Sequence, residues 1–234
     1  MQKIGIICAA DTELEPFLAL IDPKETYEKA MLRFHKGSIG QMEVIAVYSG
    51  VCKVNAAIAA QVMIDCFQVE AIINGGTAGG MDASVQLFDT VISEVMCYHD
   101  VEEEVLTQFH PWLDTIWFPA GDGLLSAAKE YAKTIDAPVR FGRMATGEQF
   151  IADEKRDEIN AQFVPLSVDM ETTAIAQVCH ANDVPFLAVR SVTDTADHRG
   201  NENFEKNCAR ASGLSAEITV GFLRWFQQAG FANM

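Results

Sequence analysis

Residues 164–194 read VPLSVDMETTAIAQVCHANDVPFLAVRSVTD, and this stretch indicates a strand, a helix and a second strand in succession. Val164–Asp169 has the length and apolar character of a buried strand, and Glu171–Asn182 has the length of a helix. Pro185–Val192 is the most continuous apolar run of the chain, as expected of a strand covered on both faces. A strand–helix–strand unit places its strands parallel in one sheet, so the stretch favours an α/β fold.

The same alternation extends over the rest of the chain. Further strands are predicted at Lys3–Ala9, Val69–Asn74, Phe88–Val95 and Val139–Ala145, with a hairpin formed by Met31–Ile39 and Met42–Ser49. Further helices are predicted from Thr12, over Lys53–Cys66, Leu124–Ile135 and Asp153–Gln162, and from about 204 to 229. The sequence contains no repeat or Pro/Ser-rich linker. We therefore predict one three-layer αβα domain over residues 1–234, with a central mixed, largely parallel sheet.

Composition excludes several classes of partner. The 17 Lys and Arg residues face 33 Asp and Glu residues, a formal net charge of −16, which disfavours binding to nucleic acid or an anionic membrane. The six cysteines are scattered without a CxxC pair, as is typical of thiols in a reducing compartment. The start of the sequence and its apolar runs lead us to expect no signal peptide and no membrane span, and the sequence has no HExxH motif. We expect a cytoplasmic protein with no metal or cofactor.

Polar residues follow the predicted strands at the points where ligands gather in α/β sheets. They are Glu13, the glycine-rich segment Gly75–Gly80 (expected to be a turn), Glu148–Phe150, Asp169–Glu171 and Arg190–Asp194. Taken singly, Glu13 and Glu171 are also explained as acids in the first turn of a helix, and Asp194 as a cap. Carboxylates at several strand ends together indicate a binding site.

The glycine-rich segment does not match the motifs that bind dinucleotides or nucleoside triphosphates. Its backbone amides can still bind a hydroxyl or a carboxylate. No Lys or Arg occurs between Lys53 and Lys129, so a phosphate in this segment would lack a cation from its own part of the chain.

The chain resembles bacterial 5′-methylthioadenosine/S-adenosylhomocysteine nucleosidases of the nucleoside phosphorylase superfamily, and the resemblance runs nearly end to end. It is carried by KIGIICAADTELEP from Lys3, SGVCKVNAA from Ser49, IINGGTAGG from Ile72, YHD at 98–100, TGEQFI from Thr146, VDMETTAIAQVCH from Val168 and VPFLAVRSVTDTAD from Val184. The resemblance implies hydrolysis of the N-glycosidic bond of a 5′-alkylthio adenosine, in methionine salvage, with release of adenine and a 5-substituted ribose.

The resemblance also implies roles for individual residues. Asp194 would be the general acid at N7 of the purine, and Glu13 would deprotonate the attacking water with Arg190 close by. Glu171 would bind the ribose hydroxyls and Met170 would pack on the sugar. The remaining substrate-binding residues would be Phe150, which stacks on adenine, Ile151, whose backbone reads the adenine edge, Val51, Thr77, and Phe204 with Val101, Phe109 and Pro111 around the 5′ group.

Part of the 5′ pocket would come from the 97–120 loop of a neighbouring subunit, so the resemblance implies a homodimer. Three departures from the family pattern lie near the expected site: Ala10 replaces a common Met, Thr77 replaces the usual Ser but keeps a hydroxyl, and residues 101–112 differ from the expected Gly- and Tyr-rich loop. The choice among methylthioadenosine, S-adenosylhomocysteine and 5′-deoxyadenosine is therefore open.

Two alternatives remain at this level. A phosphorylase of the same superfamily would use phosphate in place of water, against which the shortage of nearby Lys and Arg argues. A non-catalytic nucleoside-binding protein would keep Phe150 and Glu171 but would need neither Glu13 nor Asp194.

Overall fold

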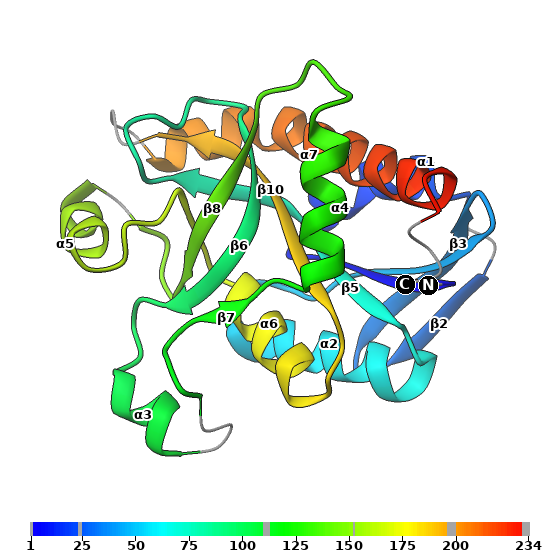
Figure 1. Cartoon of the computed structure of the whole chain (residues 1–234), viewed down its shortest axis with the longest axis horizontal. Coiled ribbons are helices and arrows are strands. Elements are labelled where there is room, and N and C mark those ends of the chain that lie inside the picture. Colours follow the sequence, from blue (N-terminus) through cyan, green and yellow to red (C-terminus); the bar gives the residue numbers. More distant parts are fainter. Residues whose placement is uncertain (1, 23–24, 110–112, 152, 196–199, 231–234) are drawn as a thin grey trace.

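The computed structural model describes residues 2–22, 25–109, 113–151, 153–195 and 200–230, and helices separate most of the strands along them, except within β2–β4 and between β5 and β6 (Figure 1). The strands are β1 (Lys3–Cys8), β2 (Glu25–Lys29), β3 (Leu32–Ile39), β4 (Met42–Tyr48), β5 (Ala71–Gly80), β6 (Thr90–Tyr98), β7 (Phe118–Pro119), β8 (Val139–Thr146), β9 (Ser167–Asp169) and β10 (Phe186–Asp194). The helices are α1 (Asp11–Leu20), α2 (Lys53–Phe67), α3 (Glu103–Gln108), α4 (Asp122–Ala132), α5 (Asp153–Phe163), α6 (Thr172–Ala181) and α7 (Gly200–Gln228).

One mixed sheet forms the centre, in the order β10-β6-β8-β9-β5-β1-β4-β3-β2. Parallel ladders join β1 to β4 and β5, β5 to β10, and β8 to β6 and β9. The pairs β10–β6, β5–β9, β3–β4 and β2–β3 are antiparallel. The predicted mixed α/β fold is confirmed. The additional β5–β10 ladder closes β5, β10, β6, β8 and β9 into a ring, a feature that the predicted mixed, largely parallel sheet did not specify.

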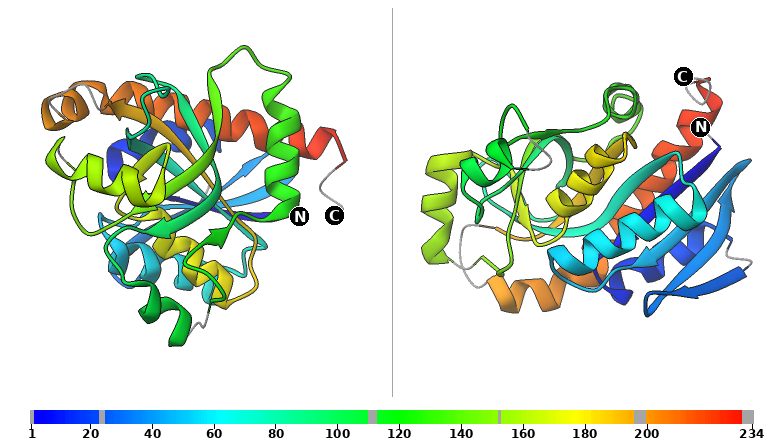
Figure 2. Two further views of the ribbon diagram at one scale, coloured as in Figure 1. Left: turned by 60° about the vertical axis from the view of Figure 1, so that its left-hand side comes forward. Right: turned by 90° about the horizontal axis from the view of Figure 1, so that it is seen from below.

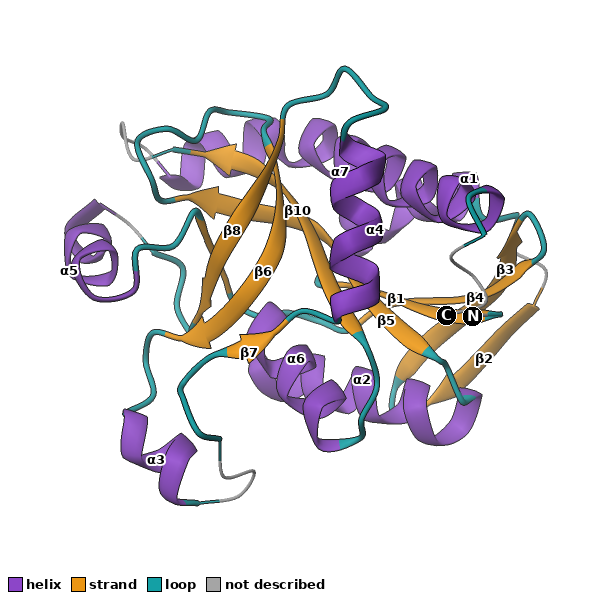
Figure 3. Cartoon of the chain, viewed as in Figure 1, coloured by secondary structure: helices purple, strands orange, loops and turns teal. Residues whose placement is uncertain are grey.

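Helices cover both faces of the sheet, as Figures 2 and 3 show. Helices α1, α4 and α7 enclose one apolar cluster against β1, β4 and β5, with Phe17 and Phe222 fully buried in it. Helices α2 and α6 enclose a second cluster on the other face, around Met63 and Ile175. The two apolar layers hold the strand ends in place. None of the helices in the described ranges is long and apolar enough to cross a membrane.

The glycine-rich segment is a strand, so the prediction of a turn there was wrong. Strand β5 continues to Gly80 and pairs with β10, with Gly75 opposite Val189 and Gly79 opposite Asp194. A β-carbon at Gly75 would overlap the ring of Phe17. The glycines therefore serve close packing of α1 against an extended strand.

Two other segments differ from prediction. Strand β2 was not predicted, because its five residues are all exposed and lack an apolar face; it pairs with β3 at the sheet edge. The 97–120 connection contains the short helix α3 and the two-residue strand β7, which pairs with β6.

Candidate active site

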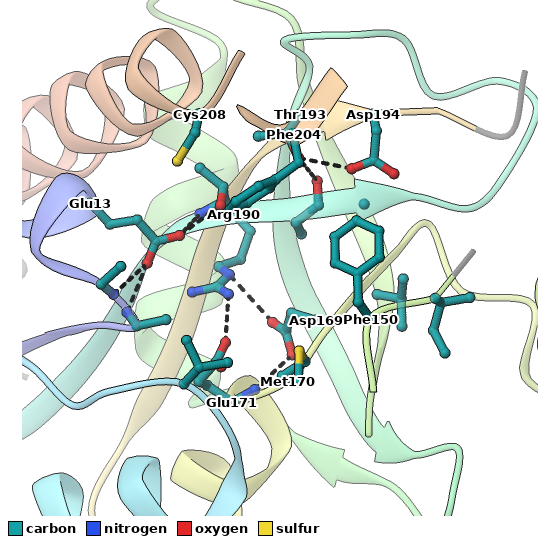
Figure 4. Close-up of a pocket in the computed structure, with 18 of the residues that line it drawn as sticks. Glu13, Phe150, Asp169, Met170, Glu171, Arg190, Thr193, Asp194, Phe204 and Cys208 are labelled. Carbon is teal, nitrogen blue, oxygen red and sulfur yellow. Dashed lines mark hydrogen bonds and ion pairs between the residues drawn. The ribbon is translucent and has the colours of Figure 1, made fainter. Parts of the chain in front are cut away.

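A cavity of about 220 Å³ lies at the carboxyl ends of β1, β5, β9 and β10 (Figure 4). Sequence-predicted residues from seven separate segments line it: Glu13, Val51, Thr77, Phe150, Ile151, Met170, Glu171, Arg190, Asp194 and Phe204. Parallel strands bring their carboxyl ends to one edge of a sheet, which explains the convergence of segments so distant in sequence.

Two predicted residues of the described chain, Val101 and Phe109, do not line this cavity. Val101 is half-buried and packs against the apolar cluster of α2 and α6. Phe109, which follows α3, has 63% of its surface exposed. Pro111 lies outside the described residues. The described residues of the 97–120 connection (97–109 and 113–120) do not line the cavity of a single chain, so a role for them there would require a second subunit.

Glu13 is held by hydrogen bonds from two directions. Its Oε1 accepts from the backbone N–H of Thr77 at 2.7 Å and from the Thr77 hydroxyl at 2.6 Å. Its Oε2 accepts from the N–H groups of Ala9 at 2.7 Å and Ala10 at 3.4 Å. Ala10 precedes the first residue of α1, so Glu13 also caps this helix. Glu13 therefore both caps the N-terminus of α1, as its position in the first turn suggested, and lines the cavity.

Arg190 is buried in β10 and surrounded by carboxylates. Its Nη2 lies 3.0 Å from Oε2 of Glu171, and its Nε lies 3.3 Å from Oδ2 of Asp169. Burial opposes its charge, but Asp169, Glu13 and Glu171 together raise the pKa of Arg190. The guanidinium is therefore permanently charged and locked in place. Asp169 lines the cavity too; the sequence analysis placed it among the polar residues at the strand ends but gave it no role of its own.

Glu171 immediately precedes α6 and is 2% exposed. Its Oε1 accepts a hydrogen bond from the backbone N–H of Cys52 at 2.9 Å. Burial raises the pKa of Glu171 to about 7, against the opposing effect of Arg190 and with a further increase from Asp169. The two hydrogen bonds described for it, from the Cys52 N–H and from Nη2 of Arg190, are both donated to the carboxyl, which acts as an acceptor in this arrangement.

Asp194 is the last residue of β10 and is 1% exposed. Its Oδ2 lies 2.6 Å from Nη2 of Arg156, a buried residue of α5. Its Oδ1 accepts a hydrogen bond from the Thr193 hydroxyl at 2.9 Å. Arg156 was not predicted. It belongs to a helix with a weak apolar pattern, and nothing local in the sequence indicates a partner 38 positions away.

Two aromatic rings form the apolar wall. The centroids of Phe150 and Phe204 are 6.0 Å apart, and their planes cross at 74°. Phe150 is 40% exposed, so it has room for another flat ring on its free surface. The cavity thus combines a surface for a planar apolar group with carboxylates, which suit a polyol carrying a positive charge. No group of three potential metal ligands occurs in the described part of the chain.

Comparisons with known proteins give consistent matches. The sequence profile of the phosphorylase superfamily matches residues 3–224. The 5′-methylthioadenosine/S-adenosylhomocysteine nucleosidase of Halalkalibacterium halodurans is 36% identical over 228 residues, which is 95% of this chain and 98% of the relative. The corresponding nucleosidase of S. pneumoniae, solved with a transition-state inhibitor, is 31% identical with a TM-score of 0.88, covering 96% of this chain and 100% of that one. The futalosine hydrolase of Helicobacter pylori is 28% identical with a TM-score of 0.88, covering 95% and 97%.

Proposed function

The chain belongs to the phosphorylase superfamily, and we propose that it is a nucleosidase that hydrolyses the N-glycosidic bond of 5′-methylthioadenosine and S-adenosylhomocysteine. The products are adenine and the corresponding 5-substituted ribose, as methionine salvage requires. The relatives described above, from H. halodurans and S. pneumoniae, are nucleosidases of these two substrates, which supports this substrate class. A structure named for a different substrate, futalosine hydrolase, has the same fold. The fold therefore does not fix the group that the 5′ side of the cavity accepts, and this group has to be tested directly.

The choice of water over phosphate rests on one observation, the position of the Glu13 carboxylate. The backbone N–H groups of Ala9, Ala10 and Thr77 donate hydrogen bonds to this carboxylate. They are therefore not available to bind a phosphate. A phosphate brought to this place would meet a buried negative charge. Among the described residues that line the cavity, the positively charged side chain is that of Arg190. It already pairs with Asp169 and Glu171. The site therefore favours a neutral nucleophile.

The proposed reaction uses the carboxylates on opposite sides of the bond. Glu13 accepts a proton from a water molecule, whose oxygen bonds to C1′ of the ribose as the bond from C1′ to N9 breaks. Positive charge develops on the sugar, and the nearby carboxylates stabilise it. Asp194 takes up a proton from solvent before the bond breaks and donates it to N7, so adenine leaves as a neutral molecule. Each proton thus has one donor and one acceptor.

Substrate binding is proposed to use the remaining cavity residues. Phe150 stacks on adenine, and the Ile151 backbone contacts its hydrogen-bonding edge. Glu171 accepts hydrogen bonds from the 2′- and 3′-hydroxyls, while Met170 packs on the sugar. Thr77 holds Glu13 in place, and Val51 and Phe204 contact the 5′ substituent. All of these residues line the same cavity, which supports the assignment.

A homodimer is part of the proposal. Val54 on α2 is 69% exposed and Ile58, one turn later, is 42% exposed; Val51, at the cavity, is 47% exposed. An apolar face this close to the cavity supports contact with a second copy, whose Val101, Phe109 and Pro111 would complete the 5′ pocket. Light scattering gives the mass in solution, and Val54→Glu should produce monomers.

The six cysteines are free thiols, which supports the proposed cytoplasmic location.

The deciding experiment measures adenine release from 5′-methylthioadenosine in phosphate-free buffer, then with phosphate, and in H₂¹⁸O. Release without phosphate and ¹⁸O in the sugar product support the hydrolase. Release that requires phosphate would make the protein a phosphorylase. S-adenosylhomocysteine and 5′-deoxyadenosine are tested in parallel. If none of the three is cleaved but they bind, the non-catalytic reading replaces the proposal.

A further inference from the structure

Arg156 is a buried cation that lies behind the cavity and does not line it. It extends from α5 to two acceptors: the backbone carbonyl of Gly80 at the end of β5, and Oδ2 of Asp194 at the end of β10. Arg156 is 3% exposed and Asp194 is 1% exposed, so water screens this ion pair very little. A buried pair of this kind persists only when both partners are held in good geometry.

The Asp194 carboxylate is restrained by three elements. Arg156 holds Oδ2 from α5, and the Thr193 hydroxyl donates to Oδ1 from β10. On β5, a β-carbon at Gly79 would lie 3.3 Å from Oδ2, so the strand backbone approaches the carboxylate closely. The carboxylate consequently has a defined position in the cavity wall.

We propose that Arg156 is a positioning residue for departure of the purine, acting through Asp194. This inference rests on the proposed function, in which Asp194 gives its proton to N7. Once the proton has left, Asp194 is a buried carboxylate, and the guanidinium stabilises that charge through a charge-assisted hydrogen bond. Arg156 also keeps the carboxylate oriented toward the cavity. Its removal should impair protonation of the leaving group and leave the sugar-side chemistry intact.

A pair of substrates separates this role from a merely structural one. 5′-Methylthioadenosine loses adenine, which requires a proton, whereas 4-nitrophenyl 5-methylthioriboside loses 4-nitrophenolate, which does not. For Arg156→Met we expect kcat on methylthioadenosine to fall roughly 10-fold or more, a part of the roughly 10²–10⁴-fold that general acid catalysis supplies. The kcat on the nitrophenyl substrate should change by less than about twofold. Arg156→Lys should restore part of the loss.

Asn160 provides a matched control on the same helix. Its Nδ2 donates to the carbonyl of Met81 at 3.0 Å, next to the Gly80 carbonyl that Arg156 contacts. In the described part of the chain, Asn160 makes no hydrogen bond to Asp194. Asn160→Ala therefore loosens α5 without removing the ion pair. We expect it to keep the wild-type ratio of the two kcat values. Circular dichroism and thermal unfolding establish that each variant is folded.

The outcomes are distinct. Equal losses on both substrates, or an Asn160→Ala variant that matches Arg156→Met, would show that α5 is only a structural support and would overturn the inference. An unchanged kcat on methylthioadenosine in Arg156→Met would also overturn it. If Arg156→Met does not fold, Arg156→Lys decides: a folded Arg156→Lys with the wild-type ratio of the two kcat values would overturn the inference. If the wild-type protein cleaves no purine nucleoside, the proposed function fails, and the inference fails with it.

Discussion

The carboxylate of Glu13 lies directly against the α-carbon of Gly76. A β-carbon at position 76 would be 2.6 Å from both Cδ and Oε2 of Glu13, and the backbone there has a φ of +136°. Both the space and the conformation require glycine. The residue next to it, Thr77, supplies two of the hydrogen bonds to Glu13. The glycine-rich strand thus provides the seat of the proposed catalytic base.

Gly76→Ala is the first prediction that follows. The added methyl group displaces Glu13 and strains the backbone, so kcat/KM should fall sharply and stability should drop by about 1–3 kcal/mol. Gly123→Ala is the matched control, because nothing lies within 4 Å of a β-carbon there and the position is in α4. It should leave activity unchanged and stability equal or raised by up to about 1 kcal/mol. Urea unfolding and adenine release measure both; similar behaviour of the two variants would contradict the prediction.

Replacement of Glu13 by Gln tests the base itself. The amide cannot accept a proton from water, and its NH₂ group faces backbone donors, so kcat should fall on the order of 10²–10⁴-fold. Glu15→Gln changes an exposed acid of the same helix and should have no effect. The measurement is single-turnover adenine release. A kcat of Glu13→Gln within twofold of that of Glu15→Gln would exclude the role.

Asp194→Asn should abolish turnover while retaining much of the affinity for substrate. The amide keeps the size and polarity of the side chain but has no acidic proton to give, which is the requirement at the purine. Calorimetric titration with 5′-methylthioadenosine measures binding, and adenine release measures turnover. Asp183→Asn, an exposed acid just before β10, serves as the control. A wild-type kcat in Asp194→Asn would rule out the assigned general acid.

The raised pKa of Glu171 predicts a pH dependence of stability. Burial raises it from an ordinary 4.5 to about 7, so the folded protein holds this proton more tightly than the unfolded chain. The stabilising contribution is complete below pH 4.5 and is lost as the pH rises through 7. The total is roughly 3 kcal/mol at about 1.4 kcal/mol per pH unit.

Glu171→Gln removes this contribution. The free energy of unfolding of the wild type should therefore fall more steeply between pH 5 and pH 8 than that of Glu171→Gln. Urea denaturation at several pH values gives both curves. Glu217→Gln alters an exposed acid of α7 and should follow the wild type. Parallel curves for wild type and Glu171→Gln would contradict the pKa assignment.

Most strands and helices, and the polar residues at the strand ends that line the site, were predictable from the local pattern of apolar and polar residues. Apolar runs of strand length located β1, β5 and β10, and the acids beyond them identified Glu13 and Asp194 as candidates. The glycine-rich strand was misread, because glycines without side chains carry no apolar alternation. Its extended form comes from pairing with β10 and from the ring of Phe17, which lie far away in the sequence.

The sequence by itself determined which chemical groups stand at the strand ends, because hydrophobic periodicity is a local property and polar residues mark where it stops. Tertiary structure alone decided how those groups are paired. Closure of the sheet between β5 and β10, the contacts of Arg190 with Asp169 and Glu171, and the contact of Arg156 with Asp194 depend on how distant elements pack. An ion pair has no sequence period, since it is set by distance and burial in the folded chain.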